Sequence, residues 1–222
     1  MMQDAEFYIL SDKDWKPFVD NIPVTMHSLI RLKSGELAYI TKRLDRIKGE
    51  KLPLEDMCQL TETLTNNKYR SSMEKIGKCI SNYSTRPGLD NTTFFETALF
   101  SFLTGNADMH LKNFSLLITK ENDIIVLPPS YDLVSTKIPM PDDLDEMALT
   151  INGRKRGLKG SDFDGLAKSL KIPAKAMENT YSKFANKINE ANEWIKISFL
   201  PAKIKKEYKN IIAENAKKIE LL

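Results

Sequence analysis

The residues best suited to chemistry lie in the segment GNADMHLKNFSLL, which begins at Gly105. Within it Asp108 and Asn113 stand five positions apart, the spacing of the catalytic loop H-R-D-x-x-x-x-N of protein kinases. Phosphoryl transfer needs a carboxylate that orients the attacking hydroxyl and accepts its proton, and it needs oxygen ligands for magnesium. Asp108 suits the first task and Asn113 the second.

A further carboxylate, Asp132, stands in the segment PPSYDL, directly after a pair of short apolar runs. The Asp of the kinase motif D-F-G holds magnesium at a similar point, although the Phe and Gly of that motif are absent here. Asp132 is therefore a candidate second metal ligand. From the residues alone, D-x-x-x-x-N is a common pattern, and a loop Asp and Asn that cap neighbouring backbone explain it equally well.

Other polar residues near this segment have structural as well as chemical interpretations. We expect His110 to pack and hydrogen-bond so that it holds the loop, and not to act as a base. Lys112 either approaches the transferred phosphate or forms an ion pair with Asp108 or another acid. Glu55 and Asp56 are expected to begin a helix, where the macrodipole favours carboxylates, and we assign them no catalytic role.

Two hairpins and a helix are predicted around the candidate residues. Residues 27–42 predict a hairpin with its turn at 33–36, and the runs 114–118 and 124–127 predict a second one. Between the hairpins, Asn91 is expected to cap a helix that ends just before Gly105. This helix is apolar on more than one face, so it should be central.

The rest of the chain is expected to be mostly helical. The charged segment 44–53 is the predicted lobe junction, and it leads into a helical pattern with Met57, Leu60 and Leu64 on one face. Beyond Phe163 the apolar periodicity is helical again. Strands early and helices late predict an α+β fold dominated by helix.

Length and composition indicate one large globular unit. The chain has 222 residues, of which 41% are hydrophobic and 28% charged, and no apolar stretch approaches the roughly 18 residues that span a bilayer. Asp4 and Glu6 stand where an export signal would carry positive charge. We therefore expect a soluble, cytoplasmic protein without membrane contact.

Neither a zinc site nor a nucleic-acid surface is indicated. The two cysteines and two histidines form no C-x-x-C or H-E-x-x-H spacing. The net charge of +3 comes from the tail after Pro201, where six lysines face three glutamates. These charges alternate around apolar positions, which is typical of a solvated amphipathic helix, so we expect no direct nucleic-acid binding.

Four segments, in order, resemble signature segments of the HipA family: LAYITKRLDR, LPLEDMCQ, GNADMHLKNFSLL and PPSYDLVSTKI. With NGRKRGLKGSDFDGLA and ISFLP behind them, the resemblance runs from about residue 22 to about residue 201. It implies a protein-kinase-like fold that binds ATP with magnesium and phosphorylates proteins on serine or threonine. The best-known members are bacterial toxins that act on aminoacyl-tRNA synthetases and are held by a DNA-binding antitoxin, so a HipB-like partner and such a substrate are implied.

The resemblance also implies roles for individual residues. Asp108 would be the catalytic base, and Asn113 and Asp132 the metal ligands. The segment Lys42-Arg43-Leu44 is similar to the one whose backbone holds adenine, with Asp45 near the ribose, although an Asp–Arg pair that closes a strand is often only a surface ion pair. Residues 1–47 would then be a partial N-terminal lobe with the hairpin and the adenine-side strand, and 48–222 the helical catalytic lobe.

One part of the family pattern is missing. A glycine-rich loop and a lysine that hold the ATP phosphates normally precede the LAYITKRLDR-like strand, but none of the nine glycines forms G-x-G-x-x-G. The chain is truncated, another chain supplies the missing part, or catalysis has been lost. Two functions follow as alternatives: a kinase that needs a separately supplied N-terminal lobe, or a catalytically impaired pseudokinase that binds a partner or a nucleotide.

Overall fold

The computed structural model describes residues 22–120 and 123–222. The strands are β1 (His27–Arg31), β2 (Leu37–Thr41), β3 (Arg46–Ile47), β4 (Glu50–Lys51), β5 (Leu54–Asp56), β6 (Ser115–Ile118) and β7 (Ile125–Val126). The helices are α2 (Met57–Leu60), α3 (Met73–Tyr83), α4 (Pro87–Leu103), α5 (Gly160–Ser169), α6 (Ala174–Ile197) and α7 (Ala202–Lys218), with 3-10 turns η1 (Thr65–Asn67) and η2 (Leu111–Asn113). This order confirms the predicted α+β fold dominated by helix.

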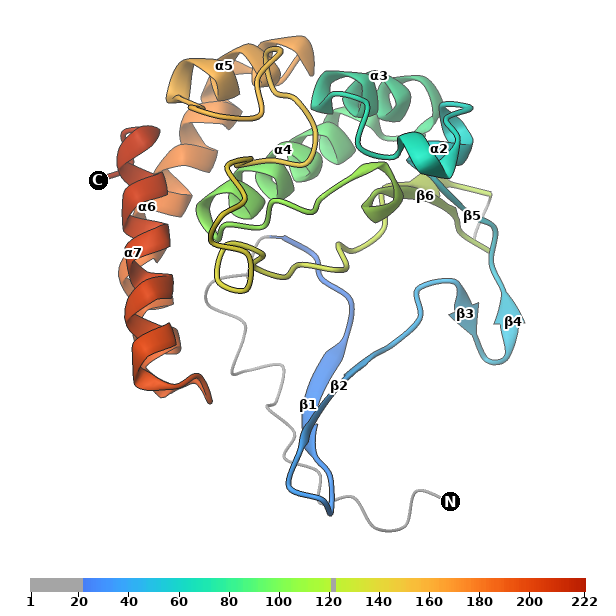
Figure 1. Ribbon diagram of the computed structural model, residues 1–222. Helices are drawn as coiled ribbons and strands as arrows, with labels where there is room; N and C mark the ends of the chain where they lie inside the picture. Colours follow the sequence, from blue (N-terminus) through green and yellow to red (C-terminus); the bar gives the residue numbers. More distant parts are fainter. Residues whose placement is uncertain (1–21, 121–122) are drawn as a thin grey trace.

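Helix α4 is the centre of the helical body, as Figure 1 shows. It packs against α3, α5 and α7. Three of its four phenylalanines, Phe94, Phe95 and Phe102, are fully buried, as expected for a helix that is apolar on more than one face. Burial of side chains of this size is a main source of folding free energy, so α4 is a rigid base for the loop that follows it.

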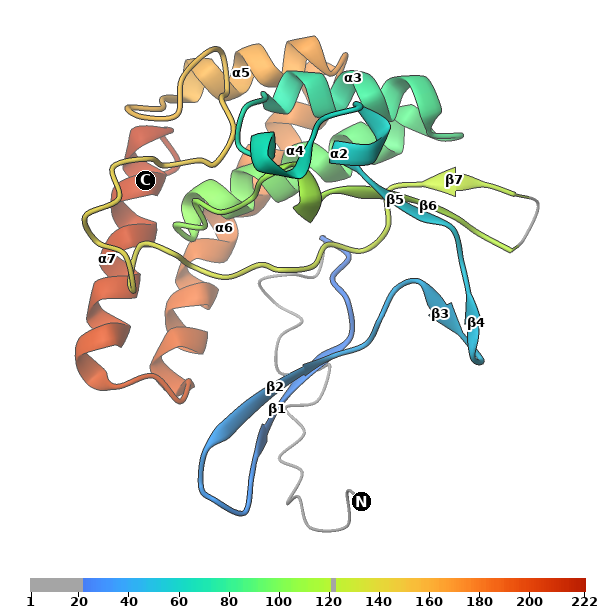
Figure 2. The same cartoon turned by 45° about the vertical axis from the view of Figure 1, so that its right-hand side comes forward.

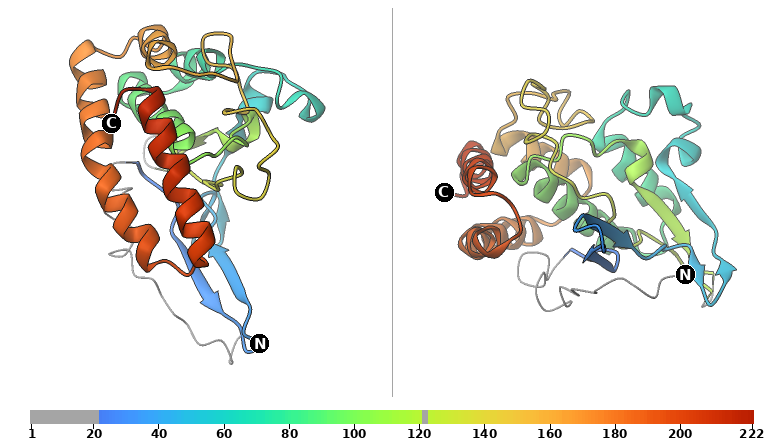
Figure 3. Two further views of the ribbon diagram at one scale, coloured as in Figure 1. Left: turned by 60° about the vertical axis from the view of Figure 1, so that its left-hand side comes forward. Right: turned by 60° about the horizontal axis from the view of Figure 1, so that its bottom comes forward.

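Helices α6 and α7 lie side by side and antiparallel along one flank of the body (Figure 3). Phe184 and Ile188 of α6 and Ile212 and Ala216 of α7 are buried. The lysine-rich tail thus forms the amphipathic helix that its pattern predicted. No helix in the described part of the chain combines the length and the apolar character needed to cross a bilayer.

The first predicted hairpin is confirmed, and it projects away from the helical body (Figures 1 and 2). Strands β1 and β2 pair antiparallel from His27 opposite Thr41 to Arg31 opposite Leu37. Gly35 in the turn has a φ of +86°, a conformation that favours glycine. A further short hairpin, β3–β4, occupies part of the segment that was predicted as the lobe junction.

The second predicted hairpin is confirmed as β6–β7, and β5 pairs with β6 to complete a three-stranded sheet. The sequence pattern did not predict β5. Strand β6 begins two residues after η2 and lies between the other two strands. The segment that carries Asp108 and Asn113 is therefore held between the end of α4 and the central strand of this sheet.

Two helix boundaries differ from the prediction. Helix α4 begins at Pro87, and Asn91 lies inside it, where its amide donates to Ser81 Oγ at 2.8 Å. Proline is pre-organised for the first helical position, so the helix starts earlier than Asn91 alone suggests. The prediction that Leu64 lies on the same helical face as Met57 and Leu60 is also wrong. Helix α2 ends at Leu60, and Glu62 has a φ of +52°, which is not helical. Leu64 is 75% exposed.

The buried carboxylate of Asp90 connects the start of α4 to the residue after β7 by hydrogen bonds. Asp90 is 1% exposed. It accepts hydrogen bonds from Ser84 Oγ at 2.6 Å, from the backbone N–H of Leu127 at 2.9 Å and from Arg86 Nε at 3.0 Å. The segment that leads to Asp132 leaves the sheet at this point, so Asp90 helps to fix its starting position.

Replacement of Asp90 by Ala is expected to lower the free energy of unfolding by about 3 kcal/mol, because buried donors lose their acceptor. For a domain of this size that corresponds to a fall in Tm of roughly 6 to 12 °C, measured by thermal denaturation. Asp142→Ala is the control, since this carboxylate is exposed. Equal melting temperatures for the two variants would contradict the role given to Asp90.

Candidate active site

The segment after α4 is held by the segment that follows Asp132. Gly105 has a φ of +68°, and its carbonyl oxygen accepts from the backbone N–H groups of Thr136 and Lys137 at 2.9 and 3.2 Å. The backbone N–H of Ala107 donates to Thr136 Oγ1 at 2.9 Å. A Cβ at Gly105 would lie 3.0 Å from Cγ2 of Ile211 and 3.1 Å from Cγ of Lys137. Both the backbone conformation and the close packing therefore require glycine here.

Three hydrogen bonds connect the segments of Asp108, Asn113 and Asp132: Asn106 joins Asp132 to Asp108, and Asn113 binds Asp108 directly. The amide of Asn106 donates to the carbonyl oxygen of Asp132 at 3.3 Å, and its Oδ1 accepts from the backbone N–H of Asp108 at 3.2 Å. The amide of Asn113 donates to the carbonyl oxygen of Asp108 at 3.0 Å. Residues that lie far apart in the sequence thus meet in one place. No sequence signal indicated a role for Asn106, because nothing in a single loop shows which distant carbonyl oxygen its amide will bind.

The carboxylate of Asp108 is half-buried and accepts a hydrogen bond from a tyrosine that the sequence analysis missed. Tyr69 Oη donates to Asp108 Oδ1 at 2.7 Å. This hydrogen bond, together with burial, raises the pKa of Tyr69 to about 12, so the phenol stays neutral and remains a donor at physiological pH. Tyr69 stands 39 positions before Asp108 in an irregular segment, and no motif or periodicity singles it out.

His110 packs beneath the loop as expected. It is 5% exposed, and its ring meets that of Tyr69 edge-on, with the ring centroids 5.0 Å apart. Burial lowers the pKa of the imidazole, which favours its neutral form. Its backbone N–H donates to the carbonyl oxygen of Asp108 at 2.8 Å, but within the described residues its Nδ1 has no hydrogen-bond partner.

Lys112 forms the second of its two expected contacts, an ion pair with an acid other than Asp108. Its Nζ lies 3.2 Å from Oδ2 of Asp56. Asp56 caps α2, as predicted for an acid at a helix start, and forms a capping box with Gln59. Glu55 does not begin the helix, because it belongs to β5.

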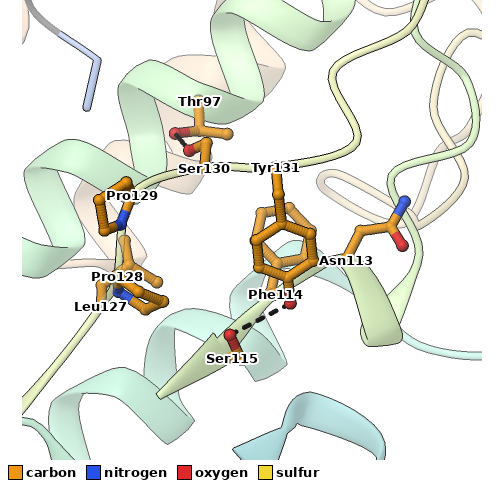
Figure 4. A pocket seen from close by; sticks show the side chains of 9 residues that line it. All are labelled: Thr97, Asn113, Phe114, Ser115, Leu127, Pro128, Pro129, Ser130 and Tyr131. Atoms are coloured by element: carbon orange, nitrogen blue, oxygen red, sulfur yellow. Dashed lines mark hydrogen bonds between the residues drawn. The ribbon is translucent and has the colours of Figure 1, made fainter. Parts of the chain in front are cut away.

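A small pocket lies between α4 and the segments that carry Asn113 and Asp132 (Figure 4). Its lining consists of Thr97, Asn113, Phe114, Ser115, Leu127, Pro128, Pro129, Ser130 and Tyr131. Tyr131 Oη donates to Ser115 Oγ at 3.1 Å and to the carbonyl oxygen of Lys112 at 3.2 Å. The pocket is small, with an empty volume of about 220 Å³, open solvent included.

Asn113 and Asp132 offer oxygen donors of the kind that magnesium prefers. The amide nitrogen of Asn113 is held by the carbonyl oxygen of Asp108, so Oδ1 is the end available to a cation. Asp132 adds an exposed carboxylate. Residues 22–120 and 123–222 contain no cluster of three or more His, Cys, Asp or Glu that would enclose a metal by itself. Magnesium commonly binds through one or two such ligands and completes its shell with phosphate oxygens and water.

Comparison with known proteins identifies the family. The family model described as the HipA-like C-terminal domain matches residues 20–192. The chain belongs to this family. Among curated proteins, this HipA-like chain is similar to two from Sinorhizobium fredii, Y4mE and Y4dM, whose names class them only provisionally as kinases.

These matches cover only part of each relative. Y4mE is 31% identical over 144 residues, which are 61% of this chain and 33% of the relative. Y4dM is 32% identical over 157 residues, which are 66% of this chain and 36% of the relative. The HipA-like chain thus matches about a third of the length of either protein.

Solved structures confirm the kinase-like fold. HipA of Shewanella oneidensis MR-1, solved in a toxin–antitoxin complex with HipB and operator DNA, superposes with a TM-score of 0.77 and 18% identity over 96% of this chain and 57% of that one. The Helicobacter pylori proinflammatory kinase CtkA superposes with a TM-score of 0.62 and 15% identity over 93% of this chain and 78% of that one. At such identities the likeness concerns the fold alone.

The residues that the resemblance places beside adenine follow β2 directly. The backbone N–H of Lys42 donates to the carbonyl oxygen of Met26 at 2.8 Å, which prolongs the pairing of the HipA-like hairpin. Arg43 is exposed and Leu44 half-buried. These positions lie at the base of the projecting hairpin, and their backbone contacts to a nucleotide stay a prediction.

Asp45 is held by arginines. Its carboxylate accepts two hydrogen bonds from Arg43, both at 2.8 Å, and one from Arg46 at 2.9 Å. The hydrogen bonds from Arg43, with the positive charges of both arginines, lower the pKa of Asp45 to about 2. The ion pair anticipated from the sequence is therefore present, and a ribose hydroxyl would have to share or displace these donors. Within the described residues no hydrogen bond joins Asp45 to the loop of Asp108.

Proposed function

We propose that this chain is the catalytic lobe of a Ser/Thr protein kinase-like toxin, which transfers phosphate from ATP to a protein hydroxyl. The observation that carries the proposal is that hydrogen bonds connect the segments of Asp108, Asn113 and Asp132 within a kinase-like fold, two through Asn106 and one directly from Asn113 to Asp108. Asp108 would orient the hydroxyl of the substrate and accept its proton. Asn113 and Asp132 would hold magnesium, which when bound neutralises charge on the phosphates.

The partners follow from the same proposal. A HipB-like antitoxin is supported by the solved complex of Shewanella HipA with HipB and operator DNA. A segment with a glycine-rich loop that binds the projecting hairpin is supported by apolar side chains exposed on that hairpin, among them Tyr39 at 62% and Leu37 at 45%. We further propose a cytoplasmic location and a protein substrate, such as an aminoacyl-tRNA synthetase.

A catalytically impaired pseudokinase is the second candidate function. Phosphoryl transfer depends on groups that position the β- and γ-phosphates, so a protein of this family without them would be such a pseudokinase. The retained Asp108, Asn113 and Asp132 favour the enzyme, since a module that only binds a partner gains nothing from two metal-directed side chains beside a base. Transfer of phosphate by the chain, alone or with an added N-terminal lobe, separates the two functions.

The binding of ATP with and without magnesium tests the proposed metal ligands. Magnesium is expected to strengthen ATP binding to the wild-type chain in isothermal titration calorimetry. Asp132→Asn and Asn113→Ala are each expected to weaken ATP binding in the presence of magnesium roughly tenfold, because each removes one oxygen ligand. The affinity for ATP without magnesium should stay unchanged. Asp142→Asn, at an exposed carboxylate, is the control. A magnesium effect of equal size in all four proteins would contradict the assignment.

A further inference from the structure

Tyr69 is fixed on the loop of Asp108 from several sides. The backbone N–H of Leu111 donates to the carbonyl oxygen of Lys68 at 3.2 Å, which ties the tyrosine segment to η2. Lys155 Nζ donates to the carbonyl oxygen of Tyr69 at 3.1 Å. The ring itself lies edge-on to His110 and has Lys68 Nζ 5.0 Å from its centroid. The phenol is thus held in one position although Tyr69 is 41% exposed.

The hydroxyl of this fixed ring meets the group that would carry out the chemistry. Tyr69 Oη donates to Asp108 Oδ1 at 2.7 Å, and no other donor in the described part of the chain bonds to this carboxylate. The hydrogen bond restrains rotation of the carboxylate and leaves its second oxygen, Oδ2, for another hydroxyl. A carboxylate can accept from both oxygens at once, so the tyrosine need not move before a substrate binds.

We propose that Tyr69 is a positioning residue, which holds the carboxylate of Asp108 so that Oδ2 receives the proton of the phosphoacceptor hydroxyl. The inference rests on the proposed function, because it concerns the orientation of the proposed base. Phosphoryl transfer is catalysed mainly by positioning and electrostatic stabilisation, so a base that rotates freely aligns the attacking oxygen less often. The effect should therefore appear in kcat, while the binding of ATP and substrate stays the same.

Tyr69→Phe is the deciding variant, because it keeps the ring and removes only the hydroxyl. The chain offers a matched control in Tyr181, whose Oη donates to Asp164 Oδ1 at 2.9 Å between α6 and α5. Tyr181→Phe loses the same kind of contact away from the loop of Asp108. Both variants would be assayed in the full chain, with a fragment that carries the family's glycine-rich loop, for transfer of radiolabelled phosphate from ATP to casein.

Tyr69→Phe is expected to lower kcat roughly tenfold with unchanged KM for ATP and casein and unchanged Tm, whereas Tyr181→Phe keeps the wild-type kcat. In an Asp108→Asn background, Tyr69→Phe should cause no further loss, because the group that it positions is gone. If Asp108→Asn is inactive but Tyr69→Phe keeps a wild-type or higher kcat, the inference about Tyr69 is wrong and the proposed function stands. A wild-type protein no more active than Asp108→Asn would contradict the proposed function, and the inference would fall with it.

Discussion

Replacement of Asp108 by Asn is expected to reduce phosphoryl transfer at least about a thousandfold while leaving the fold intact. The substitution removes the only charge of the side chain and its ability to accept the proton of the attacking hydroxyl. It changes neither the volume nor the shape of the side chain. Transfer of radiolabelled phosphate from ATP, measured beside a thermal melt, separates the loss of chemistry from a loss of stability.

The contacts of Asp108 explain why stability should survive. Its backbone carbonyl oxygen accepts from Asn113 and from the backbone N–H of His110, and its N–H donates to Asn106, so these hydrogen bonds do not involve the carboxylate. The side chain is only half-buried, and the Oδ1 of an Asn can still accept from Tyr69. We expect a change of less than about 1 kcal/mol in the free energy of unfolding.

Asp164→Asn is the matched control for this variant. Asp164 also accepts a hydrogen bond from a tyrosine hydroxyl and is also half-buried, but it lies on α5 and not in the loop of Asp108. It should keep both the rate and the melting temperature of the wild type. If Asp108→Asn instead lost several kcal/mol of stability, its carboxylate would have a structural role and the assignment as the base would be wrong.

The sequence predicted the elements whose signals are local. The hairpin of β1 and β2 follows from two mostly apolar runs around a turn that contains Gly35, and the end of α4 follows from Gly105. Asn91 was predicted as the N-cap of α4, but the helix begins at Pro87, and Asn91 lies inside it, where its amide contacts Ser81. The residue at which a helix begins depends on tertiary packing as well as on local preference, and a single sequence does not show that packing.

The candidate site was predictable only where its residues belong to a motif. Asp108 and Asn113 are recognised by their spacing, and Asp132 by its place after a hairpin. Asn106 and Tyr69 were missed, since their contacts cross 26 and 39 positions of sequence. Such long-range contacts depend on how α4, the sheet and the irregular segments pack together. The residues that we propose to position the site are therefore harder to find from the sequence than those that we propose to act in it.

The isolated chain is expected to transfer phosphate about a thousandfold more slowly than the same chain supplied with the missing phosphate-binding segment. Its sequence contains no G-x-G-x-x-G. The small pocket beside Asn113 has an empty volume of about 220 Å³, open solvent included. Without donors that neutralise and position the β- and γ-phosphates, several kcal/mol of transition-state stabilisation are absent, which corresponds to a loss of this size.

Addition of a fragment with the family's glycine-rich loop and lysine should restore part of the rate if its surface is complementary to the projecting hairpin. The measurement compares ATP-dependent phosphorylation of a protein by the isolated chain and by the mixture. The same fragment with its lysine replaced is the control, because it keeps the surface but lacks the charge that holds the phosphates. Turnover by the isolated chain at about 1 per second or more would contradict the prediction. Such a rate would place a phosphate-binding element in residues 1–26, of which residues 1–21 lie outside the described part.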